Sequence, residues 1–163
     1  MNIFAFDPDP WQSALWLDDV RKNKMILETA QLLSSAVAIN DPSWASKVYK
    51  PTHTGHPCCK WVMSSRANFY WLRSYMNDLW SQRGSHKSAE LIPVFEEYFF
   101  EGWFPSEART PFPNCAANAD LGISFKHIPD VHEAYRLYIC ERWKRDTIML
   151  TWIHGEKPSW YAS

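Results

Sequence analysis

Residues 19–31 read DVRKNKMILETAQ and carry the clearest helical signal in the chain. Apolar residues recur in and after this stretch at intervals of three to four, which places them on one face of an α-helix. They are Ile26, Ala30, Leu33 and Val37. This spacing predicts a helix from about Val20 to Ala38, with its apolar face packed against a core.

The same helix carries one carboxylate, Glu28, beside a basic face. Arg21, Lys24 and Glu28 are three and four residues apart, so their side chains lie along one side of the helix and can converge on one ligand. A single carboxylate among cations suggests work on an anionic polymer. The alternative is a solvated helix face with an ordinary ion pair.

The composition indicates one domain, residues 1–163, because a chain of this length with 46% hydrophobic residues can bury a continuous core. Residues 1–6 are apolar but run into Asp7 and Pro8, without the basic and long apolar regions of a signal peptide. No apolar run approaches the length of a membrane span. The four cysteines form no CxxC pair, which favours reduced thiols. We therefore expect a cytoplasmic protein with no membrane partner.

Charge is unevenly distributed along the chain. Residues 20–90 contain ten lysines and arginines and four acidic residues, a net charge of +6, whereas residues 1–19 and 91–163 have net charges of −4 and −3. A local positive field attracts phosphates. The alternative is an ordinary fluctuation of charge between segments, which carries no information about a partner.

The remaining sequence predicts further helices and hence an all-α fold. We expect these helices at residues 10–18, 57–83, 88–100 and 130–146. The third of the chain's helices, 57–83, ends at Gly84, and the helix 88–100 is kinked at Pro93. One face of the helix predicted at 57–83 carries a stripe that we assign to the core rather than to a ligand surface. The stripe consists of Trp61, Ser64, Asn68, Trp71, Tyr75 and Leu79.

Two segments without helical periodicity connect these helices. Residues 40–56 read as a long loop, and residues 102–129 are irregular and rich in proline. Near the end of the chain, Trp160 and Tyr161 follow Pro158. Because chain ends usually fray, this aromatic pair is either docked onto the body of the protein or presented to a partner, and bases of a nucleic acid stack on such rings.

No motif in the sequence indicates a metal or another cofactor. His53, His56 and Cys58 form an HxxHxC cluster, but a structural zinc site needs four ligands and no second Cys/His pair follows. We instead expect His56, directly before Pro57, at the N-terminus of a helix, where it caps the helix or contacts a phosphate. Glycine-rich phosphate loops, GxSxG elbows and HExxH motifs are missing from the sequence, which disfavours P-loop enzymes, α/β-hydrolases and zincins.

Three parts of the sequence, taken in order, resemble the phage pyrimidine-dimer DNA glycosylase/AP lyase family, also called endonuclease V. The first is the helix with the acidic residue, 19–28. The second is the pair Gly55-His56, which opens an amphipathic helix ending at Arg83-Gly84, and the third is PSWY at 158–161. Residues 85–150 have no counterpart in this comparison.

The resemblance implies a compact all-α domain in which the N-terminal segment threads between helices. It also implies that the α-amine of Met1 lies beside the catalytic glutamate, which corresponds to Glu28. An α-amine has a pKa near 8, well below that of lysine, so a larger fraction is neutral and nucleophilic at neutral pH. The amine would attack C1′ of a damaged nucleotide and expel the base, leaving a Schiff base that Glu28 helps to resolve by β-elimination.

The resemblance, together with the basic segment, predicts double-stranded DNA as the partner of a monomeric protein in the cytoplasm of an infected cell. The residues expected to contact DNA are Asn2, Arg21, Lys22, Lys24, Gln31, His56, Lys60, Trp160 and Tyr161. Leu27, Gln31 and Asn2 replace arginines of the family, so three phosphate contacts are missing. The alternatives are action of the same fold on a modified base or a nucleotide, and a noncatalytic phage accessory protein that binds nucleic acid or protein.

Overall fold

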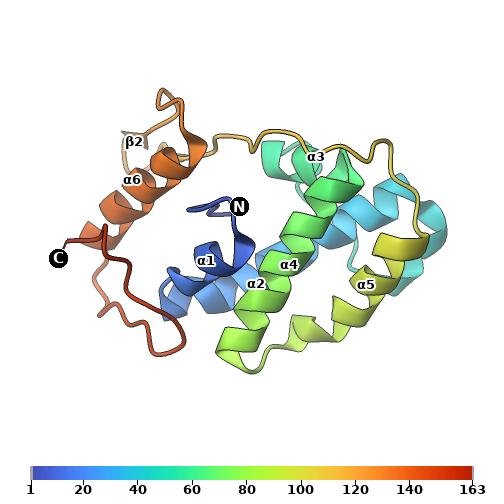
Figure 1. The fold of residues 1–163 in the computed structure, drawn as a ribbon, viewed down its shortest axis with the longest axis horizontal. Coiled ribbons are helices and arrows are strands. Elements are labelled where there is room, and N and C mark those ends of the chain that lie inside the picture. The colour runs from blue at the N-terminus through green and yellow to red at the C-terminus, as the bar shows by residue number, and fades with distance from the viewer. Residues whose placement is uncertain (1, 163) are drawn as a thin grey trace.

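Helix α2 (Asp19–Asn40) crosses the middle of the molecule and packs against α3 (Pro57–Met63) and α4 (Arg66–Arg83) (Figure 1). The computed structural model describes residues 2–162 and confirms an all-α fold. The other α-helices are α1 (Pro10–Leu15), α5 (Ile92–Glu101) and α6 (Val131–Lys144). Two 3₁₀ helices, η1 (Pro42–Lys47) and η2 (Lys87–Leu91), lie in the connections.

Helix starts follow the capping signals of the sequence. Asp9, ahead of Pro10, accepts a hydrogen bond from the backbone N–H of Trp11, and Asp18 accepts one from that of Arg21. Side-chain acceptors at this position satisfy amides that have no partner within the helix. The observed helix α2 therefore agrees with the predicted 20–38 to within two residues at each end, and α1 is shorter than the predicted 10–18.

The helix predicted at residues 57–83 is wrong in one respect, because it is broken into α3 and α4. Ser65 is extended, with φ −159° and ψ 157°, and its side chain accepts a hydrogen bond from the backbone N–H of Asn68. The hydroxyl of Ser64 donates to the carbonyl of Trp61. Serine side chains compete in this way with helical backbone hydrogen bonds and start a new helix. Gly84 ends α4 in the left-handed conformation, φ +90°, as predicted.

The helix predicted at 88–100 is also two elements, η2 and α5. Pro93 lies in the first turn of α5, where the missing N–H of proline removes no helical hydrogen bond, so it starts a helix rather than kinking one. The predicted loop 40–56 holds η1 but is otherwise irregular. The core assignment for the stripe on α3 and α4 is confirmed, since every member except the half-buried Ser64 is buried.

The irregular segment 102–129 runs from α5, past α3, to α6 along one side of the molecule (Figure 1). It contains one short feature that the sequence did not predict, an antiparallel pair of two-residue strands, β1 (Ala117–Asn118) and β2 (Ile123–Ser124). Asn114 anchors the segment, because its side-chain amide donates to the carbonyls of Phe125 and Ile128.

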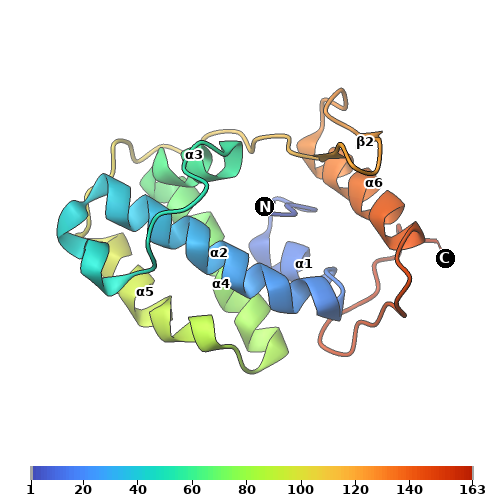
Figure 2. The same ribbon diagram turned by 180° about the vertical axis from the view of Figure 1, so that it is seen from behind.

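The N-terminal segment threads between the helices, as predicted. In two opposite views it lies between α6 and the pair formed by α2 and α4 (Figures 1 and 2). Ile3, Phe4, Ala5 and Phe6 are all buried. The side-chain oxygen of Asn2 accepts hydrogen bonds from the next two backbone amides, and Phe4 has a positive φ of 44°. The tight turn that results fits the segment into the interior.

The C-terminal segment is docked rather than frayed. The Trp160 ring lies 5.8 Å from that of Trp143 on α6 and 5.7 Å from that of Phe6. The Tyr161 ring lies 4.7 Å from that of Trp143.

Among the helices described, none is both long enough and apolar enough to cross a membrane.

Candidate functional site

A cleft of about 700 Å³ opens where α2, the N-terminal segment and α6 meet. Helix α2 forms one wall of the cleft, and Asn2 and Phe4 of the N-terminal segment also line it. Six charged side chains line the cleft, and four of them are cationic. They are Arg21, Lys24, Glu28, Lys126, Arg142 and Asp146.

Glu28 and Asn2 both line this cleft. The sequence resemblance predicts that the α-amine of Met1, rather than Asn2, lies beside Glu28. The Glu28 side chain is only 15% exposed, and its Oε1 lies 3.3 Å from Nζ of Lys24, which is 73% exposed. Met1, the proposed nucleophile, lies outside the described residues. The cleft thus combines a largely buried carboxylate, Glu28, with a largely exposed cation, Lys24.

Arg21 lines the cleft but its charge is already matched. Its guanidinium donates to Asp18 at 3.1 Å and to both carboxylate oxygens of Asp146 at 2.8 and 2.9 Å. Asp18 is fully buried and also accepts a 2.7 Å hydrogen bond from the indole of Trp143. This network joins the start of α2 to the end of α6 and so fixes the two walls of the cleft.

Lys22 does not face the cleft, so its predicted contact with DNA does not fit the structure. The side chain is buried, and its ammonium donates to Gln82 at 2.7 Å and to the carbonyl of His154 at 2.6 Å. Burial lowers the pKa of Lys22 to about 8. The residue therefore holds the C-terminal segment against α2 and α4, where a phosphate cannot reach it.

Four other residues predicted to contact DNA are not part of the cleft lining. Lys60 is exposed on α3, and Gln31 is half-buried on α2. Trp160 and Tyr161 are half-buried against α6. Asn2, Arg21, Lys24 and His56 are the predicted contacts that the fold does bring together.

Sequence reasoning missed the part of the site that follows residue 85. Lys126 comes from the irregular segment, and no local pattern pointed to it. Tyr138 and Arg142 are four residues apart on α6, a spacing that places them on one side of the helix and could have identified this wall. Asp146 follows the end of α6. The Arg142 guanidinium donates to the hydroxyl of Tyr138 at 3.0 Å.

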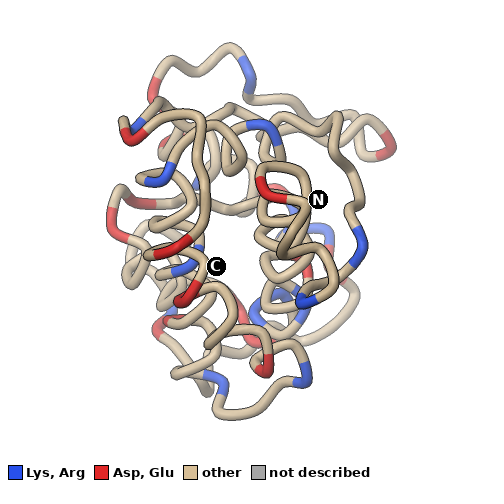
Figure 3. The backbone as a smooth tube through the Cα atoms, turned by 90° about the vertical axis from the view of Figure 1, so that its right-hand side faces the viewer, with Lys and Arg blue, Asp and Glu red and all other residues tan. Residues whose placement is uncertain are grey.

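The basic charge of residues 20–90 is partly neutralised within the molecule. Acidic residues from outside that segment pair with four of its cations, and each ion pair joins distant parts of the chain or a helix to its cap. The pairs are Arg21 with Asp18 and Asp146, Lys47 with Glu97, Arg66 with Glu107, and Arg73 with Glu96. Figure 3 shows acidic and basic positions interspersed rather than separated into one basic face. The cleft, not the whole segment, is therefore the local cationic feature.

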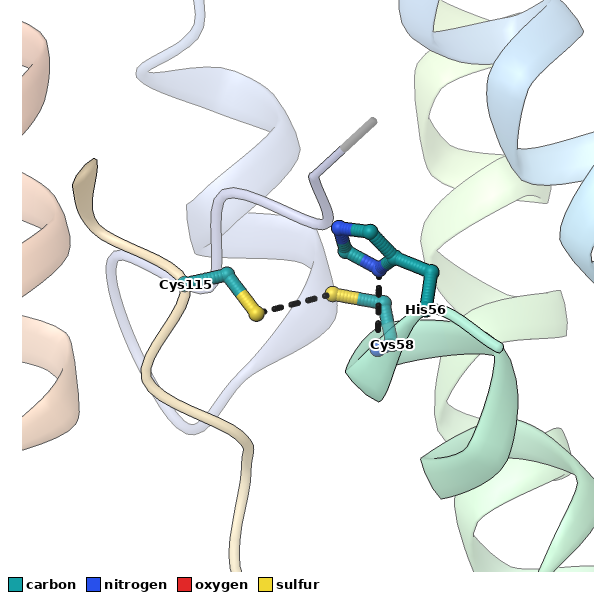
Figure 4. A group of neighbouring side chains, drawn as sticks. All are labelled: His56, Cys58 and Cys115. Carbon is teal, nitrogen blue, oxygen red and sulfur yellow. Dashed lines mark hydrogen bonds between the residues drawn. The ribbon is translucent and has the colours of Figure 1, made fainter. Parts of the chain in front are cut away.

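His56, Cys58 and Cys115 lie together at one edge of the cleft (Figure 4). His56 caps α3 as predicted, since its Nδ1 accepts a 3.1 Å hydrogen bond from the backbone N–H of Cys58. Burial lowers the pKa of His56. The Cys58 thiol contacts the sulfur of Cys115 at 3.8 Å, and this contact lowers the pKa of Cys115 to about 7. Cys115 belongs to the irregular segment, 57 residues from Cys58, so the spacing of residues in the sequence could not predict that it joins this group.

Comparison with protein-family models, with curated proteins and with solved structures finds no match to this chain.

Proposed function

We propose that the protein is a DNA glycosylase with AP lyase activity that acts on damaged or modified pyrimidines. The observation that carries the proposal is the shared lining of one cationic cleft by Asn2 and Glu28. Asn2 is bonded directly to Met1, so an α-amine at Met1 is one residue from a wall of the same cleft as the carboxylate. An amine nucleophile and a sheltered carboxylate are the two groups that this chemistry requires.

The reaction uses only these two groups. The neutral amine attacks C1′ of the deoxyribose, and the C1′–N bond to the base breaks, with its electron pair and then a proton passing to the base. The C1′–O4′ bond of the sugar ring then breaks, O4′ keeps its electron pair and takes up a proton from solvent, and the new C1′–N bond becomes an iminium. Glu28 stabilises the positive charge that develops on the sugar, and then takes a proton from C2′ as the 3′ phosphate leaves by β-elimination.

The charges of the cleft suit a DNA backbone. Asp18 and Asp146 both pair with Arg21, and Glu28 lies near Lys24. With Lys126 and Arg142 included, the four cations outnumber these three carboxylates, which leaves a surplus of one positive charge. Lys126 is exposed. Exposed cations bind phosphates by releasing counterions, which makes affinity dependent on salt. We therefore assign Lys24, Lys126 and Arg142 to the phosphates on either side of the lesion.

Apolar side chains at the rim support action on a base removed from the duplex. Val20 and Ile148 line the cleft and are each 51% exposed, and the adjacent Met149 is 85% exposed. Proteins that distort DNA insert apolar side chains such as these between base pairs to unstack them. A target nucleotide must leave the stack before C1′ can be reached in a cleft. We assign the role of this wedge to Ile148 and the adjacent Met149.

The substitution Glu28→Gln tests the proposal, because it keeps the size of the side chain and removes its charge. Turnover on duplex DNA with an abasic site should fall by roughly 100-fold or more. Binding should hold or tighten, since a carboxylate no longer faces the phosphates. Glu101→Gln, at an exposed position at the end of α5, is the matched control and should leave both quantities unchanged.

Two results would contradict the role of Glu28. Full turnover by Glu28→Gln would remove the residue from the mechanism. Loss of the cooperative thermal transition in this variant alone would show that Glu28 serves the fold instead. Binding, turnover and thermal unfolding should therefore be measured on the same preparations.

A further inference from the structure

The cluster of His56, Cys58 and Cys115 has the composition of a metal site. One nitrogen of the imidazole and the two sulfur atoms all lie within 4.8 Å of one another. Imidazole and thiolate groups are the usual protein ligands of zinc, and sites with two cysteines and one histidine keep a fourth position for solvent or substrate. No other group of three such ligands was found among residues 2–162.

The separation of the two sulfur atoms fits a shared zinc ion. Two thiolates bound at about 2.3 Å to a tetrahedral zinc ion lie about 3.8 Å apart. The Sγ atoms of Cys58 and Cys115 are 3.8 Å apart in the structure. The backbone therefore already holds these two ligands at the spacing that the metal requires, although they are 57 residues apart in the sequence.

We infer that His56, Cys58 and Cys115 bind one zinc ion, with the fourth ligand position directed toward the cleft. His56 and Cys115 both line the cleft, whereas Cys58 is fully buried and is not part of the lining. On binding, the two thiols lose their protons to solvent, and the contact between the sulfurs is replaced by two sulfur–zinc bonds. No change of oxidation state is involved.

Metal binding changes the role of His56. Its Nδ1 now accepts the backbone N–H of Cys58 (Figure 4). When zinc is bound, Nδ1 either holds the metal or carries the ring proton, so this capping hydrogen bond is lost in both cases. One capping interaction is a small loss against the binding of zinc by two thiolates.

Zinc binding should join two parts of the chain and stabilise the fold. Cys58 begins α3, whereas Cys115 belongs to the irregular segment 102–129 that runs on to α6. A zinc ion between them would cross-link α3 to this segment beside the cleft. A ligand that binds the folded chain and not the unfolded one raises stability in proportion to its occupancy, so zinc should raise the melting temperature.

The test is a titration of the full chain, prepared metal-free under reducing conditions, with Zn²⁺ and with Co²⁺. Wild-type protein should bind one zinc ion per chain, gain a higher melting temperature and show sulfur-to-cobalt charge-transfer absorption. Cys115→Ser and His56→Ala should each weaken zinc binding by roughly 100-fold or more. Cys59→Ser removes a neighbouring buried thiol that lies outside the cluster, and this control should bind zinc as the wild type does.

Three outcomes would overturn the inference. One is no charge-transfer band and no zinc in the reduced wild-type protein. Another is equal loss of binding in Cys59→Ser. The third is a Cys58–Cys115 disulfide found by mass after air oxidation, in a protein that binds no zinc when reduced, which would identify a redox pair instead. Cys115→Ser and His56→Ala change half-buried positions, so the test does not depend on tolerance of a change at the buried Cys58.

The inference does not depend on the proposed enzymatic activity. Metal content, absorption and melting temperature are measured without DNA. The amine chemistry proposed for Met1 is measured without metal, in the presence of a chelator. Failure of one experiment therefore leaves the other intact.

Discussion

Replacing Asp18 by alanine should be one of the most damaging single changes near the cleft. The carboxylate is fully buried, caps α2 through the backbone N–H of Arg21, and accepts from the Arg21 guanidinium and the Trp143 indole. Loss of the cap removes about 1 kcal/mol. The buried indole N–H left without an acceptor costs about 2 kcal/mol. Loss of one hydrogen bond from the Arg21 guanidinium adds about 1 kcal/mol, because Asp146 still pairs with this side chain.

The free energy of unfolding should thus fall by about 4 kcal/mol, which corresponds to roughly 10 °C in melting temperature for a chain of this size. Urea unfolding followed by tryptophan fluorescence measures the change. Asp9→Ala is the matched control, since Asp9 caps α1 from an exposed position and should cost about 1 kcal/mol.

The substitution Asp18→Asn separates the cap from the network. Asparagine caps helices as well as aspartate does. Its side-chain NH₂ group, however, replaces one carboxylate oxygen with a donor, which would face the donors of Arg21 and Trp143. Its cost should therefore lie between those of Asp18→Ala and Asp9→Ala. If Asp18→Ala costs no more than Asp9→Ala, the network does not hold α2 to α6 and the account of the cleft walls is wrong.

Three further outcomes are expected. Lys24→Glu should reduce the slope of log affinity for DNA against log salt concentration by about 1. Lys87→Glu, which lies outside the cleft lining, should leave this slope unchanged. Equal slopes in the two variants would show that the cleft does not bind DNA. Burial lowers the pKa of Lys22 from 10.5 to about 8. Between pH 8 and pH 10.5 the unfolded chain therefore binds more protons than the folded chain, so the free energy of unfolding should rise with pH over this interval. The rise should be seen in the wild type relative to Lys22→Met. A difference that does not change with pH would contradict the burial. Trp160→Ala should lower the free energy of unfolding by about 3 kcal/mol, because the ring packs on Trp143. A stable variant that loses only DNA affinity would make Trp160 a stacking platform.

Local sequence signals predicted most of the fold. Apolar spacing placed α2, because this periodicity depends on residues within one or two turns of each other. The break at Ser65 was missed, since the apolar stripe continues through it and hides the competing serine hydrogen bonds. The candidate site was only half predictable for a similar reason. Glu28 and Lys24 share one helix, whereas the contacts that remove Lys22 from the surface come from Gln82 and His154, 60 and 132 residues away.

Borohydride trapping tests the central claim most directly. The protein is incubated with duplex DNA that contains an abasic site, and borohydride reduces any imine to a stable amine. We predict a covalent protein–DNA adduct that peptide mapping places on the α-amine of Met1, and its loss when that amine is chemically blocked. Absence of an adduct, or an adduct on a lysine side chain, would contradict the proposed lyase and favour a noncatalytic DNA-binding protein.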